Sequence, residues 1–408
     1  MLKDFFNEQL NIKEAHELPD KLMHALMNNK EQLFDAFIDK GMTTDVDTMN
    51  DFFQSEHSDR NSFMQDFTPS SITKVVKGII EKQHSIADIC GGVGGLSNQL
   101  EYDDIYIEEL SKRTIPLLLF VLAIRNKKAT VWNGDSLTGE VNEIYQLTPT
   151  DRYSEITITN TTPREFDALV SNPPYSLKWD DKKLQDDDRF VWYPTAPKSK
   201  ADYAFVLHGL SKLKDNGTMA FVLPHGVLFR GSNEGKIRQQ LIEENLLDAV
   251  IGMPGDMFFN TSIQTVILVF KKNRENKNVL FIDASRDTQK NNRKYNYLTD
   301  DQIEKVLVTY KHRMEVSKYS HVADIEEIKQ NDFNLNIPRY VDTYEPEPVP
   351  DLIETLKEII DVKEEIKKAD EEIYTSMLQL IGTTPESKKE LEEARPYFER
   401  LLKDAKTR

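Results

Sequence analysis

The residue types best suited to chemistry form one tetrad, Asn172-Pro173-Pro174-Tyr175, which follows an apolar run at residues 168–171. The run indicates a buried strand, and two successive prolines stiffen the turn after it. This turn would present an amide and an aromatic ring at a strand end. A rigid turn with a surface tyrosine is the structural alternative, but we expect the tetrad to be catalytic.

The tetrad offers two hydrogen-bond acceptors and one aromatic face. Oδ1 of Asn172 and the carbonyl of Pro173 can hold both N–H bonds of a planar amine such as the N6 amine of adenine. The Pro173 carbonyl has no local competitor because Pro174 lacks an N–H. Tyr175 can stack on the base. Catalysis would then rest on positioning and hydrogen bonding, without a metal or a covalent enzyme intermediate.

Further aromatic residues could grip such a base, which must leave a duplex to reach the site. Phe258 and Phe259 precede an apolar run at residues 265–270, and we expect one of them to form the wall opposite Tyr175. Aromatic residues also lie in the polar segment after the tetrad, at Trp179, Trp192 and Tyr193. That segment could close over DNA, or it could be a surface loop anchored by its aromatic side chains.

A glycine-rich loop follows an apolar run at residues 85–89. Its glycines allow the backbone to approach a ligand closely. Alone this is a weak signal, which could serve a dinucleotide, a phosphate or no ligand. The loop lacks Gly-Lys-Ser/Thr, so a triphosphate is not expected. The residues predicted here to bind a cofactor are Asp88, Gly92, Val93, Gly94 and Gly95.

Three acidic positions at successive strand ends strengthen the prediction of a cofactor site. Asp88 ends the first strand, and Glu108-Glu109 ends the second, where a carboxylate can accept from both hydroxyls of a ribose. Asp135 ends the third and can accept from an adenine amine. Each acid alone could be a solvated turn residue, but the series favours S-adenosyl-L-methionine, whose amine and sulfonium suit acidic surroundings.

Alternating strands and helices set the fold class. The predicted strands are residues 85–89, 105–108, 129–132, 168–171, 219–223, 249–253 and 265–270. The predicted helices between them are residues 70–82, 111–125, 203–213 and 236–244. This order predicts an α/β fold with a doubly wound, seven-stranded, mostly parallel sheet. The last strand has no long helix before it and can be a closing antiparallel strand at the sheet edge.

Both ends of the chain are predicted to be helical. Apolar residues recur at helical spacing in residues 1–62, and Gly41 marks a helix end. After the acidic linker at residues 345–350, a heptad-like stripe runs through Leu352, Leu356, Ile359, Ile366 and Ile373. The stripe could pack on its own domain or on a partner chain, and the linker favours the partner. We expect three parts, at residues 1–62, 63–345 and 346–408.

Composition limits the function classes. The chain has a formal charge of −17, whereas proteins that grip DNA unaided are usually basic. The single cysteine, Cys90, excludes an internal disulfide, and a small packed residue is favoured there over a catalytic thiol. No signal peptide or membrane span is expected, which fits the cytoplasm. The eight histidines show no metal-ligand spacing with cysteine, so no metal site is expected.

Taken together, these motifs resemble the modification (M) subunits of type I restriction systems, within the N6-adenine DNA methyltransferases. The segment Gln65-Asp66-Phe67-Thr68-Pro69-Ser70 is similar to the family's Gln-x-(Phe/Tyr)-Thr-Pro segment, which contacts the cofactor. Residues 226–231 and 259–265 match its downstream segments, and the resemblance covers about residues 60–345. It implies Glu109, and not Glu108, as the ribose acid. The family's glycine loop usually begins Asp-Pro and contains a serine, both absent here.

The resemblance implies the activity and the partners. The activity would be transfer of a methyl group from S-adenosylmethionine to a flipped-out adenine of double-stranded DNA. Two M chains would join one specificity (S) subunit, which reads the DNA sequence, with a restriction (R) subunit as an optional further partner. Three alternatives stay open: methylation of RNA or of a glutamine side chain, a non-catalytic assembly subunit, and a stand-alone methylase.

Overall fold

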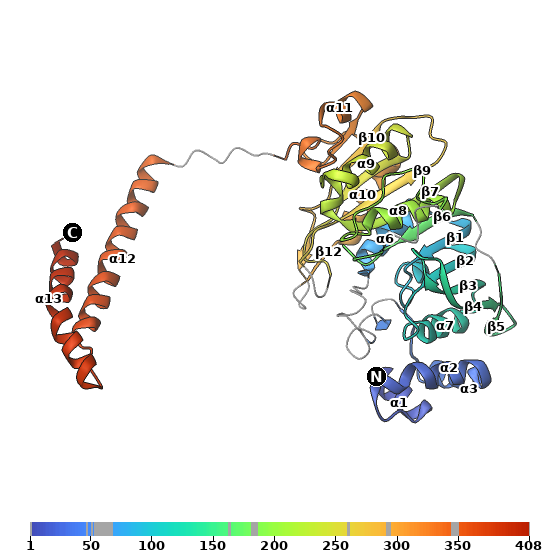
Figure 1. Ribbon diagram of the computed structural model, residues 1–408, viewed down its shortest axis with the longest axis horizontal. Coiled ribbons are helices and arrows are strands. Elements are labelled where there is room, and N and C mark those ends of the chain that lie inside the picture. Colours follow the sequence, from blue (N-terminus) through green and yellow to red (C-terminus); the bar gives the residue numbers. More distant parts are fainter. Residues whose placement is uncertain are drawn as a thin grey trace. The chain divides into compact units, whose positions relative to one another are not determined.

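The computed structural model of the chain describes residues 2–45, 48–49, 52, 68–161, 165–180, 187–258, 262–290, 295–343 and 351–407. It divides into two compact units, Met1–Thr343 and Tyr344–Arg408 (Figure 1). Among the helices of these residues, none has both the length and the apolar character needed to cross a membrane.

The first unit is built on one large sheet. Within the described ranges it has eleven strands, in the order β13-β10-β8-β9-β7-β6-β1-β2-β3-β4-β5. Their bounds are β1 Gln83–Ile89, β2 Tyr102–Glu109, β3 Ala129–Asp135, β4 Glu140–Thr148, β5 Glu155–Ile158, β6 Phe166–Ser171, β7 Leu213–Pro224, β8 Leu247–Gly252, β9 Thr265–Lys271, β10 Val279–Asp283 and β13 Ser320–Ala323. A separate pair joins β11 (Gln289–Lys290) to β12 (Asn296–Tyr297).

The predicted α/β fold with a mostly parallel sheet is confirmed, and each of the seven predicted strands is present, as β1, β2, β3, β6, β7, β8 and β9. Strands β3, β2, β1, β6 and β7 pair in parallel, and the order reverses direction between β1 and β6. The sheet has four more strands than predicted, because β4, β5, β10 and β13 extend it on both sides.

Strand β9 is antiparallel to its neighbours, as predicted, but its predicted place at the sheet edge is wrong. It lies between β7 and β8 and pairs with both. Residues 265–270 are buried on both faces of the sheet, so an apolar strand of this kind gains most from an interior position. Strand β8 takes its second neighbour from β10, in parallel.

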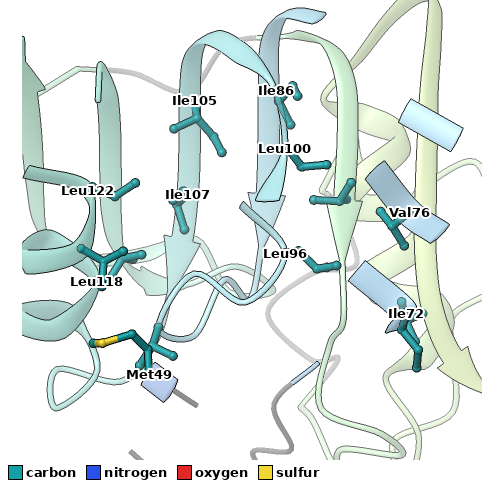
Figure 2. Close-up of a cluster of buried hydrophobic side chains, with 14 of the residues drawn as sticks. Met49, Ile72, Val76, Ile86, Leu96, Leu100, Ile105, Ile107, Leu118 and Leu122 are labelled. Atoms are coloured by element: carbon teal, nitrogen blue, oxygen red, sulfur yellow. The ribbon is translucent and has the colours of Figure 1, made fainter. Parts of the chain in front are cut away.

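Helices cover both faces of the sheet. The side chains of α6 (Ser70–Ile80), α7 (Ile115–Ile124) and α10 (Asp300–His312) belong to one hydrophobic core, part of which Figure 2 shows. The side chains of α8 (Asp202–Ser211) and α9 (Ser232–Glu243) form a second core with the opposite face. Alternate strand residues divide between the two: Ile86 and Ile105 face the first core, Ala87 and Tyr106 the second.

The N-terminal helices extend the first core. They are α1 (Leu2–Leu10), α2 (Leu18–Asn28) and α3 (Lys30–Asp39), and Gly41 follows with a left-handed φ of 65°. The ring of Phe120, on α7, meets three of their phenylalanines edge-to-face, at centroid distances of 5.4 Å from Phe6, 5.3 Å from Phe34 and 5.1 Å from Phe37. These contacts hold the N-terminal helices on α7.

The second unit is a helical hairpin. Helix α12 (Leu352–Leu378) carries the predicted stripe, and α13 (Pro385–Thr407) packs along it. The prediction of a long helix is confirmed, while the return helix was not predicted. Asp351 caps α12 by accepting from the N–H groups of Ile353 and Glu354. Much of the stripe is not covered by α13, since Leu352 is 70% exposed and Ile366 is 56% exposed.

Candidate active site

The carboxyl ends of β6, β1, β2 and β3 meet at one edge of the sheet, next to the point where the strand order reverses. Open α/β sheets bind ligands at such a point. A cavity of ≈ 400 Å³ lies there. The predicted site residues that line it are Thr68, Gly92, Gly95, Glu109, Asp135, Asn172, Pro173, Pro174 and Tyr175. The sheet thus brings the tetrad and the strand-end acids together from segments more than a hundred residues apart in the chain.

Hydrogen bonds hold the tetrad in place. The hydroxyl of Tyr175 donates to Oδ1 of Asn172 at 2.6 Å, and Nδ2 of Asn172 donates to Oγ1 of Thr68 at 3.0 Å. The amide is therefore oriented from both ends, with its oxygen toward the tyrosine. Thr68 was predicted as a cofactor residue, and the structure also makes it a direct partner of the tetrad.

Phe258 lies behind Tyr175. Its ring meets the Tyr175 ring edge-to-face at 5.8 Å and 83°, and its side chain is only 3% exposed. Phe258 is not part of the cavity lining, so in this structure it supports Tyr175 and does not form the opposite wall predicted for it. Phe259, the other predicted wall, lies outside the described residues.

The backbone just after the tetrad is fixed by a carboxylate that the sequence did not single out. Ser176 has a left-handed φ of 52°, and its N–H donates to Oδ1 of Asp202 at 2.8 Å. Asp202 is fully buried, and Arg230 donates to its other oxygen at 2.7 Å. In the sequence Asp202 looks like any acid in a first helical turn, so no signal distinguished it.

The glycine loop has the backbone that its composition predicts. Gly92 and Gly94 have φ values of 58° and 90°, which side chains rarely adopt. Asp88 is buried beneath the loop and accepts from the N–H of Ser97 at 3.2 Å. Burial raises the pKa of Asp88 to about 7 despite that hydrogen bond, and the nearby Glu109 raises it further. Asp88 thus lies below the cavity and not on its surface.

The two acids that end β2 point to opposite faces. Glu109 lines the cavity, and its carboxylate accepts from the N–H groups of Gly92 at 2.9 Å and Ser111 at 2.7 Å. Burial raises the pKa of Glu109 in spite of these donors. Glu108 faces the α8 side, where it contacts Nε2 of His208 at 2.8 Å and Nζ of Lys212 at 3.2 Å. Strand alternation therefore leaves Glu109 as the acid available to a ligand in the cavity.

Asp135 ends β3 in a tight turn. Its Oδ1 accepts from the N–H groups of Leu137 at 2.9 Å and Thr138 at 3.3 Å, and the whole turn, residues 135–138, lines the cavity. The turn also presents apolar surface beside its carboxylate, through Leu137. This combination suits a planar base with an exocyclic amine.

The remaining predicted residues lie around the cavity or outside the described residues. Pro69 and Ser70 begin α6, Val93 is buried in the core, and Gly94 shapes the loop. None of these four is part of the cavity lining. Gln65, Asp66 and Phe67 lie outside the described residues.

Cys90 lines the cavity with a left-handed φ of 63°. Burial raises the pKa of its thiol well above the usual value, and the carboxylates of Glu109, Glu108 and Asp88 raise it further. Acidic surroundings stabilise the neutral thiol, so Cys90 is not an activated nucleophile.

Comparison with known proteins decides the family. The model of the N-6 DNA methylase family matches residues 48–348. The chain belongs to this family. It is 32% identical over 326 residues to the methylase subunit of the type I restriction enzyme MpnII from Mycoplasma pneumoniae. That match covers 74% of this chain and 58% of the MpnII subunit.

Solved structures agree with this N-6 DNA methylase assignment. The methyltransferase subunit of a type I restriction-modification system from Streptococcus thermophilus has 40% sequence identity and a TM-score of 0.59, over 68% of this chain and 59% of that one. A structure from Listeria monocytogenes, provisionally assigned as a class I S-adenosylmethionine-dependent methyltransferase, has a TM-score of 0.51 over 76% of this chain and 95% of that one. Its 16% identity shows the fold alone. The chain spans less than two thirds of the MpnII and Streptococcus relatives.

Proposed function

We propose that this N-6 DNA methylase is the modification subunit of a type I restriction-modification system and transfers a methyl group from S-adenosylmethionine to N6 of adenine in double-stranded DNA. The observation that carries the proposal is the array of Thr68, Asn172 and Tyr175 on the wall of the same cavity as Glu109 and Asp135. One cavity then serves both reactants.

The chemistry of the cavity fits S-adenosylmethionine. Two carboxylates, Glu109 and Asp135, offer acceptors for ribose hydroxyls and for an adenine amine, and Leu110 and Leu137 add apolar surface. The cofactor would supply an electrophilic methyl group on a sulfonium. The backbone of Gly92, held by Glu109, lets the chain approach the cofactor closely. The structure from Listeria monocytogenes that shares this fold is provisionally assigned as an S-adenosylmethionine-dependent methyltransferase.

The tetrad would hold the nucleophile. An adenine N6 amine entering beside Tyr175 could donate one N–H to Oδ1 of Asn172, taking the place of the Tyr175 hydroxyl, and the other to the carbonyl of Pro173. Both acceptors stabilise the positive charge that develops on nitrogen as its lone pair attacks the methyl carbon. The methylated nitrogen would then release one proton to solvent and become a neutral amine. Tyr175, backed by Phe258, would stack on the flipped-out base.

Assembly with a specificity subunit would account for features that the catalytic site leaves unexplained. The chain has a formal charge of −17, which opposes binding to DNA unaided. The hairpin of α12 and α13 carries apolar residues that are exposed within its own unit, such as Leu352 and Ile366. We propose that the hairpin packs against helices of the specificity subunit, with two modification chains to one specificity chain and a restriction subunit as an optional partner.

The test is expression in a host that lacks adenine methylation, alone and together with the product of any adjacent reading frame that resembles a specificity subunit, followed by mapping of N6-methyladenine. We expect a sequence-specific mark only when both chains are present. A mark from the single chain would make it a self-sufficient methylase. No mark in either case, with both chains verified as soluble and complexed, would contradict the proposed activity and favour a non-catalytic role or a different substrate.

Docking is tested separately by deleting residues 351–408. The shortened chain should fail to co-purify with the specificity subunit while still binding S-adenosylhomocysteine, because the cavity lies wholly in the first unit. Complex formation that survives the deletion would overturn the assignment of the hairpin.

A further inference from the structure

Arg189 reaches from the segment after the tetrad to the turn that ends β3. Its Nη1 donates to the carbonyl of Ser136 at 2.6 Å, and its Nη2 donates to the carbonyl of Leu137 at 2.7 Å. Both carbonyls belong to the turn that lines the cavity beside Asp135. One planar guanidinium therefore holds two successive peptide groups of that turn.

The guanidinium is itself held in place. Its Nε donates to Oδ1 of Asp187 at 2.9 Å and its Nη2 to Oδ2 at 2.6 Å, which makes the pair bidentate. Nη1 also donates to Nδ1 of His208 at 2.7 Å. Because an arginine can only donate, Nδ1 of His208 must accept, which leaves its Nε2–H to donate to Glu108 at 2.8 Å. The chain of contacts from Arg189 thus ends on a buried carboxylate of β2.

Arg189 also contacts the cavity wall indirectly, through the rings of Phe190 and Trp179. The guanidinium lies 4.8 Å from the centroid of the Phe190 ring, and that ring packs against Trp179 at 6.0 Å. Trp179 lines the cavity, and its indole N–H donates to the carbonyl of Pro197 at 3.0 Å. The segment after the tetrad is therefore connected through Arg189 to the strand end that carries Asp135.

We propose that Arg189 is a positioning residue that sets the Asp135 turn for the adenine of the cofactor and joins that turn to the Trp179 wall of the cavity. The inference rests on the proposed function, since it assigns this part of the cavity to S-adenosylmethionine. Arg189 is not part of the cavity lining, so it acts through the peptide groups of Ser136 and Leu137. Without it both carbonyls lose their donor, and the turn gains freedom that the cofactor must remove on binding.

The first measurement uses the full chain without cofactor. Hydrogen exchange of the Leu137 and Thr138 amides, which donate to Asp135, should be at least about tenfold faster in Arg189→Gln than in the wild type. Arg189→Lys keeps the charge but cannot bridge two carbonyls and His208 at once, so it should show the same change to a lesser degree. Arg152→Gln is the matched control, because Arg152 pairs with Asp35 outside the cavity lining. Exchange that is unchanged in both Arg189 variants would overturn the proposal.

The second measurement is calorimetric binding of S-adenosylhomocysteine. Arg189→Gln should weaken it about tenfold, while in an Asp135→Ala background the same change should cost less than about threefold, since the two residues act on one turn. Losses that multiply fully would show that Arg189 does not act through Asp135, and they would overturn the proposal. A wild-type chain that does not bind S-adenosylhomocysteine would overturn the proposed function. Wild-type binding that Arg189→Gln leaves unchanged would overturn only the present inference.

Discussion

The hydroxyl of Tyr175 donates a hydrogen bond to Oδ1 of Asn172 at 2.6 Å. Oδ1 of Asn172, the acceptor proposed for the substrate amine, thus already accepts from the hydroxyl of Tyr175, the residue whose ring is proposed to stack on the base. In the proposed mechanism the amine of adenine takes the place of the Tyr175 hydroxyl at this acceptor. Tyr175 therefore orients the amide of Asn172 in the absence of a base, and we propose that its ring stacks on the base once it is bound.

Tyr175→Phe and Tyr175→Ala separate these two roles. The phenylalanine keeps the ring and loses one hydrogen bond, so it should lower kcat less than about tenfold. The alanine also loses base stacking, worth about 1–3 kcal/mol, and should raise the KM for DNA by about tenfold or more. Steady-state kinetics of the assembled enzyme measure kcat and the KM for DNA in both variants. Equal losses in both variants would contradict a stacking role.

Asn172→Ala should abolish methyl transfer and leave cofactor binding nearly intact. Removing one acceptor of the developing charge is expected to cost at least about a hundredfold in kcat. Asn172 hydrogen-bonds to Thr68 and Tyr175, whereas the acids proposed to hold the cofactor are Glu109 and Asp135, so S-adenosylhomocysteine binding should change by no more than about threefold. Radiolabelled methyl transfer and calorimetry measure the two quantities. Retained transfer would remove the amine-holding role.

Glu109→Ala and Glu108→Gln form a matched pair on adjacent residues. Glu109 lines the cavity and holds the Gly92 N–H, so its loss should weaken S-adenosylhomocysteine binding by about tenfold or more. Glu108 is buried on the other face, where the hydrogen bond from His208 and the ammonium of Lys212 lower its pKa despite burial. Glu108→Gln should lower Tm and leave the affinity for S-adenosylhomocysteine nearly unchanged. Calorimetry and thermal unfolding of both variants measure the two quantities. Weaker binding in Glu108→Gln than in Glu109→Ala would contradict the assignment.

Asp88→Asn should change how stability depends on pH. Burial raises the pKa of Asp88 from 3.8 to about 7, so between these values the folded chain holds a proton that the unfolded chain has lost. Stability therefore falls as pH rises through this window, and the loss is complete above about pH 7. The free energy of unfolding of the Asp88→Asn variant, taken relative to that of the wild type, should therefore increase by at least about 1 kcal/mol as pH rises from about 5 to about 8. Urea unfolding measures this difference, and a constant offset at all pH values would contradict it.

Local sequence patterns predicted seven of the strands of the large sheet correctly. The buried strands were visible because each is a short apolar run that must be covered on both faces, as in β6 or β9. Strand β4 was missed because residues 140–146 are exposed or half-buried and mostly polar, so they lack such a run. The return helix α13 was missed for a similar reason, since its residues are largely charged and only Ala405 is buried.

The candidate site divides in the same way. The chemistry-bearing residues could be predicted from the sequence, since an Asn-Pro-Pro-Tyr turn, a glycine loop and acids at strand ends each have a local signature. Asp202 and Arg189 could not, because an acid at a helix start and an arginine in a loop have no pattern of their own. Their importance comes from what they touch across the fold.

By itself, then, the sequence determined the seven predicted strands and the tetrad, since periodicity and turn chemistry are properties of neighbouring residues. The tertiary structure alone decided that β9 lies inside the sheet and that Phe258 lies behind Tyr175. It also placed Glu109 on the cavity wall, which the family resemblance had implied. It also joined Arg189 to the turn after Asp135. Such relationships depend on strand order and on side-chain packing between distant segments, which local sequence patterns do not encode.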